Sequence, residues 1–151
     1  MKMEDAVQQL VAQNQRLLQN LNTERHCKCE INQLIGEIIG KKIPSSTEIR
    51  LPFYTDFGRN IKIGKNVFIN SNVMLADEGG IVIEDGVKIG SNVQILSVDT
   101  VLSSKKVIIK KGAKIGSGSI IYPGVVIGRN AKILPGSIVK HSIEDNSICK
   151  E

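Results

Sequence analysis

A six-residue spacing of aliphatic side chains constrains the fold of this chain more than any other feature of its sequence. The spacing runs from residue 63 to residue 139, with one shift of two residues and one short interruption. The positions on it are Ile63, Ile69, Leu75, Ile81, Ile83, Ile89, Ile95, Ile109, Ile115, Ile121, Ile127, Ile133 and Val139. Helices repeat every 3.6 residues and strands every two, so neither produces this pattern, whereas a chain that turns after each short strand does.

A second set of positions supports this interpretation. Four residues after most of the spaced aliphatics the side chain is small or β-branched: Val67, Val73, Val87, Val93, Ala113, Ser119, Val125, Ala131 and Ser137. Turn-forming segments such as Gly64-Lys65-Asn66 and Gly90-Ser91-Asn92 lie between the sets. Three short strands close a triangle, and coils of roughly 18 residues stack about 4.8 Å apart. We therefore expect residues 58–148 to form about five coils of a prism whose aliphatic columns are the core.

The N-terminal part of the chain has a helical pattern instead. Apolar residues recur at three- and four-residue steps from residue 5 to residue 40, and Gly40 is a natural stop. Asn22-Thr23 can cap the start of a second helix. We expect these helices to cover the N-terminal end of the prism, because its open strand edges need cover. The sequence thus divides into a helical segment, 1–50, and a repeat domain, 51–151.

Composition excludes several classes of protein. The net charge is +5, but five scattered aromatic residues offer no stacking platform for nucleic acid. The longest apolar run has four residues, Val73 to Ala76, so no membrane span is expected, and the polar N-terminus predicts no signal peptide. Cys27, Cys29 and Cys149 fit neither a disulfide framework nor a zinc site, and we expect a cytoplasmic protein without a metal.

Several motifs resemble one family. The segment from Pro52 to Gly64, PFYTDFGRNIKIG, is similar to the opening of the maltose, galactoside and nodulation-type sugar O-acetyltransferases, and Tyr122 to Ala131 is similar to their late coils. The helical segment resembles their N-terminal maltose-acetyltransferase segment. The resemblance implies a mainly β fold, a left-handed parallel β-helix of about five coils with an N-terminal α-helical segment. It also implies a homotrimer whose acetyl-CoA sites lie between subunits.

The resemblance also implies a reaction and its residues. In this family a histidine removes a proton from a sugar hydroxyl, which then attacks acetyl-CoA. Thr100 occupies the histidine position here, and a threonine hydroxyl is no base near neutral pH. Asp99, one residue earlier, is a candidate replacement, but an unperturbed carboxylate is a weak base for an alcohol. Activity is therefore expected to be weak or lost.

Other family positions carry over unevenly, and Leu134-Pro135 replaces a Gly-Ala pair that the family has beside the cofactor. Asn70 matches an acceptor-binding asparagine, and Asp77 and Glu78 match an acidic pair near the sugar. The alternative is that Asn70 is a turn residue and both acids are solvated. By the same resemblance, the cofactor-binding positions are Ser117, Pro135, Lys140 and His141.

Two further questions stay open in the sequence. Lys105, Lys106, Lys110, Lys111 and Lys114 form a local basic cluster. These lysines are either solvated faces of the prism or an anion site for the phosphates of CoA. The second question is the activity itself: the alternative to a sugar acetyltransferase is a catalytically silent β-helix homologue that acts as a trimeric scaffold or binding protein.

Overall fold

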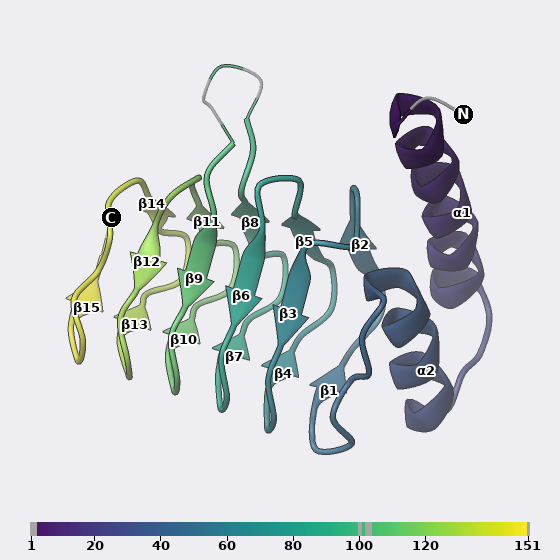
Figure 1. Ribbon diagram of the computed structural model, residues 1–151. Helices are drawn as coiled ribbons and strands as arrows, with labels where there is room; N and C mark the ends of the chain where they lie inside the picture. Colours follow the sequence, from purple (N-terminus) through teal and green to yellow (C-terminus); the bar gives the residue numbers. More distant parts are fainter. Residues whose placement is uncertain (1–2, 100, 102–103, 151) are drawn as a thin grey trace.

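Helices and strands are segregated along the chain (Figure 1). The structure is a computed structural model that describes residues 3–99, 101 and 104–150. Two helices come first, α1 (Met3–Thr23) and α2 (Lys28–Ile39). Short strands follow: β1 (Glu48–Ile49), β2 (Phe53–Thr55), β3 (Ile61–Ile63), β4 (Phe68–Ile69), β5 (Val73–Ala76), β6 (Ile81–Ile83), β7 (Lys88–Ile89), β8 (Gln94–Leu96), β9 (Val107–Ile109), β10 (Lys114–Ile115), β11 (Ile120–Ile121), β12 (Val126–Ile127), β13 (Lys132–Ile133), β14 (Ile138–Val139) and β15 (Ile148–Cys149).

The strands form three parallel sheets that wrap around one core. Sheet A has the order β1-β4-β7-β10-β13-β15, sheet B β2-β5-β8-β11-β14 and sheet C β3-β6-β9-β12. In the last coil an isolated bridge between Ile127 and Ile143 continues sheet C. Each coil passes through sheets A, B and C in turn, so the described residues form five coils. The predicted fold class, a mainly β left-handed parallel β-helix with an N-terminal helical segment, is confirmed.

Three edges join the sheets, and we name each by the sheets it connects. The AB edge consists of residues 50–52, 70–72, 90–93, 116–119 and 134–137. The BC edge consists of residues 56–60, 77–80, 97–106, 122–125 and 140–142, of which Thr100, Leu102 and Ser103 are not described. The CA edge consists of residues 64–67, 84–87, 110–113, 128–131 and 144–147. The longest segment on any edge, residues 97–106, therefore lies on the BC edge.

The predicted columns form the core. All thirteen aliphatic residues of the six-residue spacing are buried, and so are all nine residues of the second set. Parallel pairing stacks equivalent residues directly: Ile69 pairs with Ile89, Ile89 with Ile115, and Ile115 with Ile133 in sheet A. Close packing of this kind leaves room for side chains only. Any chemistry must therefore take place on the outer faces and edges of the prism.

The tight corners use residues in the left-handed region of backbone space. Asparagines occupy it at five of them: Asn66, Asn72, Asn92, Asn130 and Asn146, with φ between 56° and 65°. Asparagine and glycine tolerate this conformation better than other residues do. The turn-formers between the strands therefore set the corners, as the sequence predicts.

The helices cover the N-terminal end of the prism (Figure 1). Leu21 of α1 and Ile35 and Ile38 of α2 are fully buried in the common core. The Asn22 side chain donates to the Phe53 carbonyl oxygen at 2.9 Å and accepts from the Phe53 N–H at 3.0 Å. It thus pairs with the backbone of β2, the edge strand of sheet B, as a neighbouring strand would.

Two expectations for this region need correction. Asn22 and Thr23 do not begin a second helix, because α1 continues through both and α2 starts after Cys27; the Asn22 side chain is engaged with β2 instead. The coils begin at Glu48 in β1, ten residues before the predicted start at residue 58. Gly40 does end α2, with φ at 70°, as predicted. Neither helix of the described chain has the length and apolar character needed to cross a bilayer.

Candidate active site

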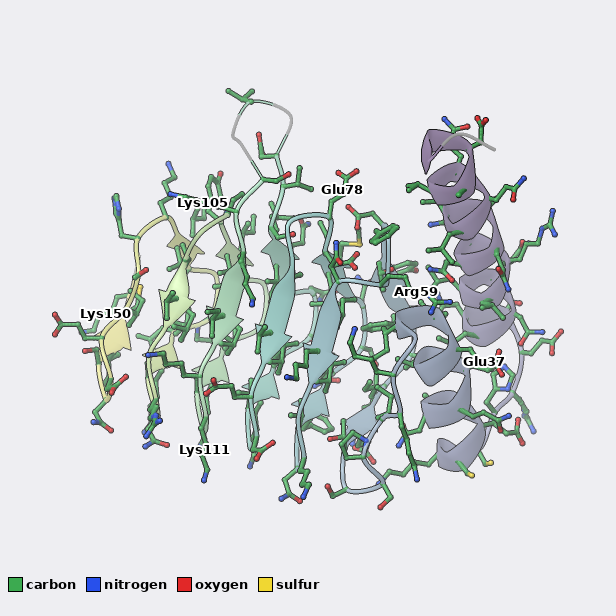
Figure 2. All side chains as sticks on the ribbon, viewed as in Figure 1. Glu37, Arg59, Glu78, Lys105, Lys111 and Lys150 are labelled. Atoms are coloured by element: carbon green, nitrogen blue, oxygen red, sulfur yellow. The ribbon has the colours of Figure 1, made fainter. Side chains whose placement is uncertain are left out.

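The candidate site residues fall on two edges that border sheet B. Asn70, Ser117 and Pro135 lie on the AB edge, before the sheet B strands. The other described candidates lie on the BC edge, after those strands: Asp77, Glu78, Asp99, Lys140 and His141. Figure 2 shows Glu78 and Lys105 at this BC edge, with Lys111 at the opposite edge of the prism. Sheet B separates the two groups within one chain.

Asp77 is a buried carboxyl group that organises the BC edge. Its side chain has no exposed surface, so it is not solvated. One carboxyl oxygen accepts from the N–H groups of Phe57 (3.0 Å) and Gly58 (2.8 Å), and the other accepts from Asn60 N–H (3.0 Å). Burial, together with the neighbouring Asp56 carboxyl group, raises the pKa of Asp77 to about 6. Asp77 holds the segment between β2 and β3 in place.

Glu78 and Asp99 differ from Asp77 in that solvent reaches them. Glu78 is exposed, and its carbonyl oxygen accepts from the Asn60 side-chain amide at 3.1 Å. Asp99 is half-buried and accepts a hydrogen bond from Val101 N–H at 2.9 Å. Thr100, the residue at the family histidine position, lies outside the described residues. Glu78 and Asp99 are thus carboxylates of the BC edge that solvent reaches, as is the half-buried Asp56.

Ser97 closes the base of the segment that carries these residues. Its buried hydroxyl donates to the Ala76 carbonyl at 2.6 Å and accepts from Gly79 N–H at 2.9 Å, so it ties two coils together. Its own carbonyl accepts from Lys105 N–H at 2.8 Å. Ser97 could not be identified from the sequence, because a single serine at the position that Asp77 and Pro123 occupy in the neighbouring coils gives no signal on its own.

Lys140 and His141 lie on the same edge, two coils beyond Ser97 and three coils beyond Glu78. Both are exposed, and the Lys140 ammonium lies 5.7 Å from the centre of the Tyr122 ring. A cation at this distance from an aromatic face is attracted to it. Lys140 and His141 therefore offer positive charge at the C-terminal end of the BC edge.

The AB edge combines close packing with open backbone. Asn70 uses its side-chain oxygen to accept from Ser71 N–H at 2.8 Å, as a turn residue does. The exposed Ser117 packs against Gly90, where a Cβ atom would lie 2.6 Å from the Ser117 nitrogen. At Gly136, beside Pro135, a Cβ atom would meet nothing within 4 Å. A ligand can thus approach the backbone at this position.

The basic cluster of the sequence does not form one patch. Lys105 and Lys106 lie on the BC edge and Lys110 and Lys111 on the CA edge, while Lys114 faces outward on sheet A. Pairing brings other lysines together instead, because Lys88, Lys114 and Lys132 are direct neighbours on adjacent strands. Within the described residues, no three His, Cys, Asp or Glu side chains gather as a metal site would require.

Comparison with known proteins gives the family. The pattern described as "Bacterial transferase hexapeptide (six repeats)" matches residues 106–141, and that described as "Hexapeptide repeat of succinyl-transferase" matches residues 60–97. Both patterns are hexapeptide repeats of transferases, so the chain carries the repeats that are typical of a hexapeptide-repeat acetyltransferase. No protein of curated function matches this chain by sequence.

Several solved structures are similar to this chain over nearly its whole length. A galactoside acetyltransferase in complex with coenzyme A has a TM-score of 0.87 and 28% identity, over 98% of this chain and 79% of that one. A hexapeptide-repeat acetyltransferase from Vibrio cholerae O1 biovar eltor, complexed with acetyl coenzyme A, has a TM-score of 0.87 and 27% identity, over 95% and 82%. A maltose O-acetyltransferase from Clostridium difficile 630 has a TM-score of 0.85 and 27% identity, over 95% and 82%.

Proposed function

We propose that this chain is an acetyl-CoA-dependent O-acetyltransferase that acts on sugar hydroxyls. The observation that carries the proposal is the match, over 98% of the chain, to a galactoside acetyltransferase with coenzyme A bound. A match to a maltose O-acetyltransferase supports a sugar as the acceptor. The fold itself leaves only edges and outer faces for chemistry, and the candidate residues gather on two edges.

Acetyl-CoA, the proposed acyl donor, fits the residues that are present. The open backbone at Gly136, beside Ser117 and Pro135 on the AB edge, leaves room for an extended chain to approach. Lys140 and His141 are exposed and supply positive charge for its phosphate groups. When bound, acetyl-CoA supplies an activated acyl group in its thioester.

We propose that the BC edge and Asn70 hold the acceptor. Glu78 is exposed and can accept hydrogen bonds from sugar hydroxyls, and Asn70 can offer its amide. Asp77 acts through the backbone of residues 57–60, which its carboxyl group holds, because none of its surface reaches solvent. It is a positioning residue in this proposal.

The acyl transfer itself needs a base that the chain supplies weakly. The acceptor hydroxyl oxygen attacks the thioester carbonyl carbon, the carbon–sulfur bond breaks, and the hydroxyl proton must pass to a base. Thr100 cannot take that proton near neutral pH, so Asp99 is the nearest carboxylate in the sequence that can. Loss of a positioned base costs about a hundred- to ten-thousand-fold in rate. We therefore expect slow turnover.

A homotrimer would bring the two groups of candidates together. The outward residues of sheet B form a mainly apolar column: Tyr54, Met74, Gln94, Ile120 and Ile138. Tyr54 is 40% exposed and Ile138 44%, so the column is available to a partner. Packing sheet B of one subunit against another would place an AB edge near a neighbouring BC edge. The acceptor and the acyl donor would then share a site between subunits.

The alternative function is a silent homologue that binds partners as a trimeric scaffold, and Thr100 at the histidine position favours it. The location that we propose is the cytoplasm, which fits three unpaired cysteines, Cys27, Cys29 and Cys149. Neither proposal requires nucleic acid, a membrane or a metal.

Calorimetric titration with acetyl-CoA tests the proposed function. We expect binding at micromolar to millimolar acetyl-CoA, and slow acetylation of at least one sugar in a panel. Chromatography should follow CoA release, because Cys27 and Cys29 are exposed and would react with thiol reagents. Binding without transfer supports the scaffold alternative. The absence of binding at millimolar acetyl-CoA would refute the enzyme proposal.

A further inference from the structure

A small cavity on the outer face of sheet C has an unusual lining. It has a volume of about 390 Å³, within the range of small-molecule sites. Four basic side chains from separate parts of the chain line it: Lys41 after α2, Arg59 before β3, Lys62 in β3 and Lys106 before β9. The floor includes the backbone of Gly79 and Gly80. None of the residues that line the cavity is acidic.

The four charges have no carboxylate partners in the described part of the chain. The ion pairs among residues 3–99, 101 and 104–150 join His26 to Glu30 and Glu48 to Arg50, neither of which touches the cavity. The Nε atom of Arg59 is buried and has no hydrogen-bond partner in these residues. Cations that converge without counterions repel one another, and a bound anion relieves that repulsion.

Two of the cations are held in position. The Lys41 ammonium donates to the carbonyl oxygens of Arg59 (3.3 Å) and Ile61 (3.1 Å). An ammonium has three N–H donors, so one stays available to a ligand. The Arg59 guanidinium packs over Gly40, where a Cβ atom would come within 2.2 Å of its Nη1 atom. A cation that is already positioned loses little conformational entropy when it binds.

The cavity adjoins the residues proposed for the acceptor. Gly79 and Gly80, which line it, follow Glu78 directly, and the lining residue Asn60 donates its side-chain amide to the Glu78 carbonyl. Lys106 ends the segment that begins at Ser97 and carries Asp99. Figure 2 shows Arg59 near the end of α2 and Glu78 at the BC edge, and the two residues belong to adjacent coils. A ligand bound in the cavity therefore lies next to the backbone that carries Glu78.

We propose that this cavity binds an anionic group, a phosphate monoester or a carboxylate, carried by the sugar acceptor. The arginine can form paired hydrogen bonds to either group, and the lysines add charge. The inference rests on the proposed function for the identity of the acceptor, while anion binding itself can be measured without turnover. It narrows the substrate class from sugars in general to acidic sugars.

Calorimetric titration at low ionic strength with glucose 6-phosphate, glucuronate and glucose tests the proposal. We expect at least one of the two anions to bind tenfold or more tightly than glucose, and the tighter one identifies the group. Arg59→Gln combined with Lys62→Gln should weaken anion binding at least tenfold. A matched loss of two charges, Arg16→Gln with Arg25→Gln on and after α1, should change it less than twofold.

Lys62→Gln alone guards against misfolding, because Lys62 points outward from sheet C and its loss removes no packing. We expect this variant to keep the melting temperature of the wild type and to bind the anion severalfold more weakly. Equal binding of glucose and both anions would overturn the proposal, as would equal losses in the cavity and control variants.

Acetyl-CoA titration of the same samples separates this inference from the proposed function. If anion binding depends on Arg59 and Lys62 but acetyl-CoA does not bind, the proposed enzymatic function is refuted and the anion site is supported. If the protein acetylates neutral sugars as efficiently as acidic ones, the enzymatic function is supported, but the proposal that the cavity binds the acceptor is refuted.

Discussion

Replacing Asp77 by asparagine should make the stability of the protein less dependent on pH. Asp77 is fully buried, and its two carboxyl oxygens accept three backbone N–H groups from residues 57–60. Burial outweighs these hydrogen bonds, so the pKa of Asp77 rises from an ordinary 3.8 to about 6. An asparagine keeps one oxygen acceptor but turns an N–H toward Asn60, where two donors then face each other.

The size of the effect follows from the two pKa values. The folded state keeps the Asp77 proton at pH values where the unfolded chain has lost it, so this stabilisation is complete below pH 3.8 and disappears as pH rises through 6. The difference of about two pH units corresponds to about 3 kcal/mol in full. Between pH 4.5 and pH 7.5 the wild type should lose about 2 kcal/mol through this group. Asp77→Asn has no such loss.

Urea unfolding followed by circular dichroism measures the difference, at one protein concentration and at several pH values. At pH 4.5 we expect Asp77→Asn to be less stable than the wild type by about 1 kcal/mol, because one buried N–H loses its acceptor. At pH 7.5 the variant should equal or exceed the wild type. Asp56→Asn, which removes the neighbouring charge, should reduce the pH dependence. A destabilisation by Asp77→Asn that grows as pH rises would refute the reasoning, because it would require a lowered pKa.

Three other variants test separate parts of the structure. Asn22→Ala leaves a backbone N–H and a carbonyl of β2 unpaired under α1, and should lower the free energy of unfolding by about 2–4 kcal/mol in urea titrations. Gly116→Ala should lower the melting temperature more than Gly136→Ala, because a Cβ atom at position 116 would lie 2.5 Å from the Pro135 nitrogen, whereas at position 136 the space is open and only the φ of 75° disfavours alanine. Thr100→His should raise acetyl transfer, measured as CoA release by chromatography, about a hundred- to ten-thousand-fold if the base alone is missing.

The core of this fold could be predicted because its signal is local. Each six-residue unit contributes an aliphatic residue to a column, so the spacing can be recognised in the sequence without knowledge of distant contacts. The first coil could not be placed in this way. Phe53 and Thr55 occupy inward positions in β2 where later coils carry valine or serine and an aliphatic residue, respectively, so the pattern in the sequence begins only at Ile63.

The site was harder to predict because the chain returns to the same edge only after about twenty residues. Lys106 and Lys110 are close in sequence but lie on different edges, whereas Lys88 and Lys114 are distant in sequence and adjacent in sheet A. The cavity combines Lys41 from the segment after α2 with Arg59 of the first coil and Lys106 of the third, so no local motif indicates it. The burial of Asp77 likewise depends on backbone donors from the preceding coil.

The hydrogen bond between the Ser97 carbonyl and Lys105 N–H has a practical consequence for engineering. It joins the two ends of the segment at its base, where Ser97 is already anchored to the coil below. Replacing the chain between Ser97 and Lys105 by a loop of a different length should leave the pairing of β8 and β9 with their neighbouring strands unchanged. Catalytic groups could therefore be transplanted onto this solenoid at one place without redesign of the scaffold.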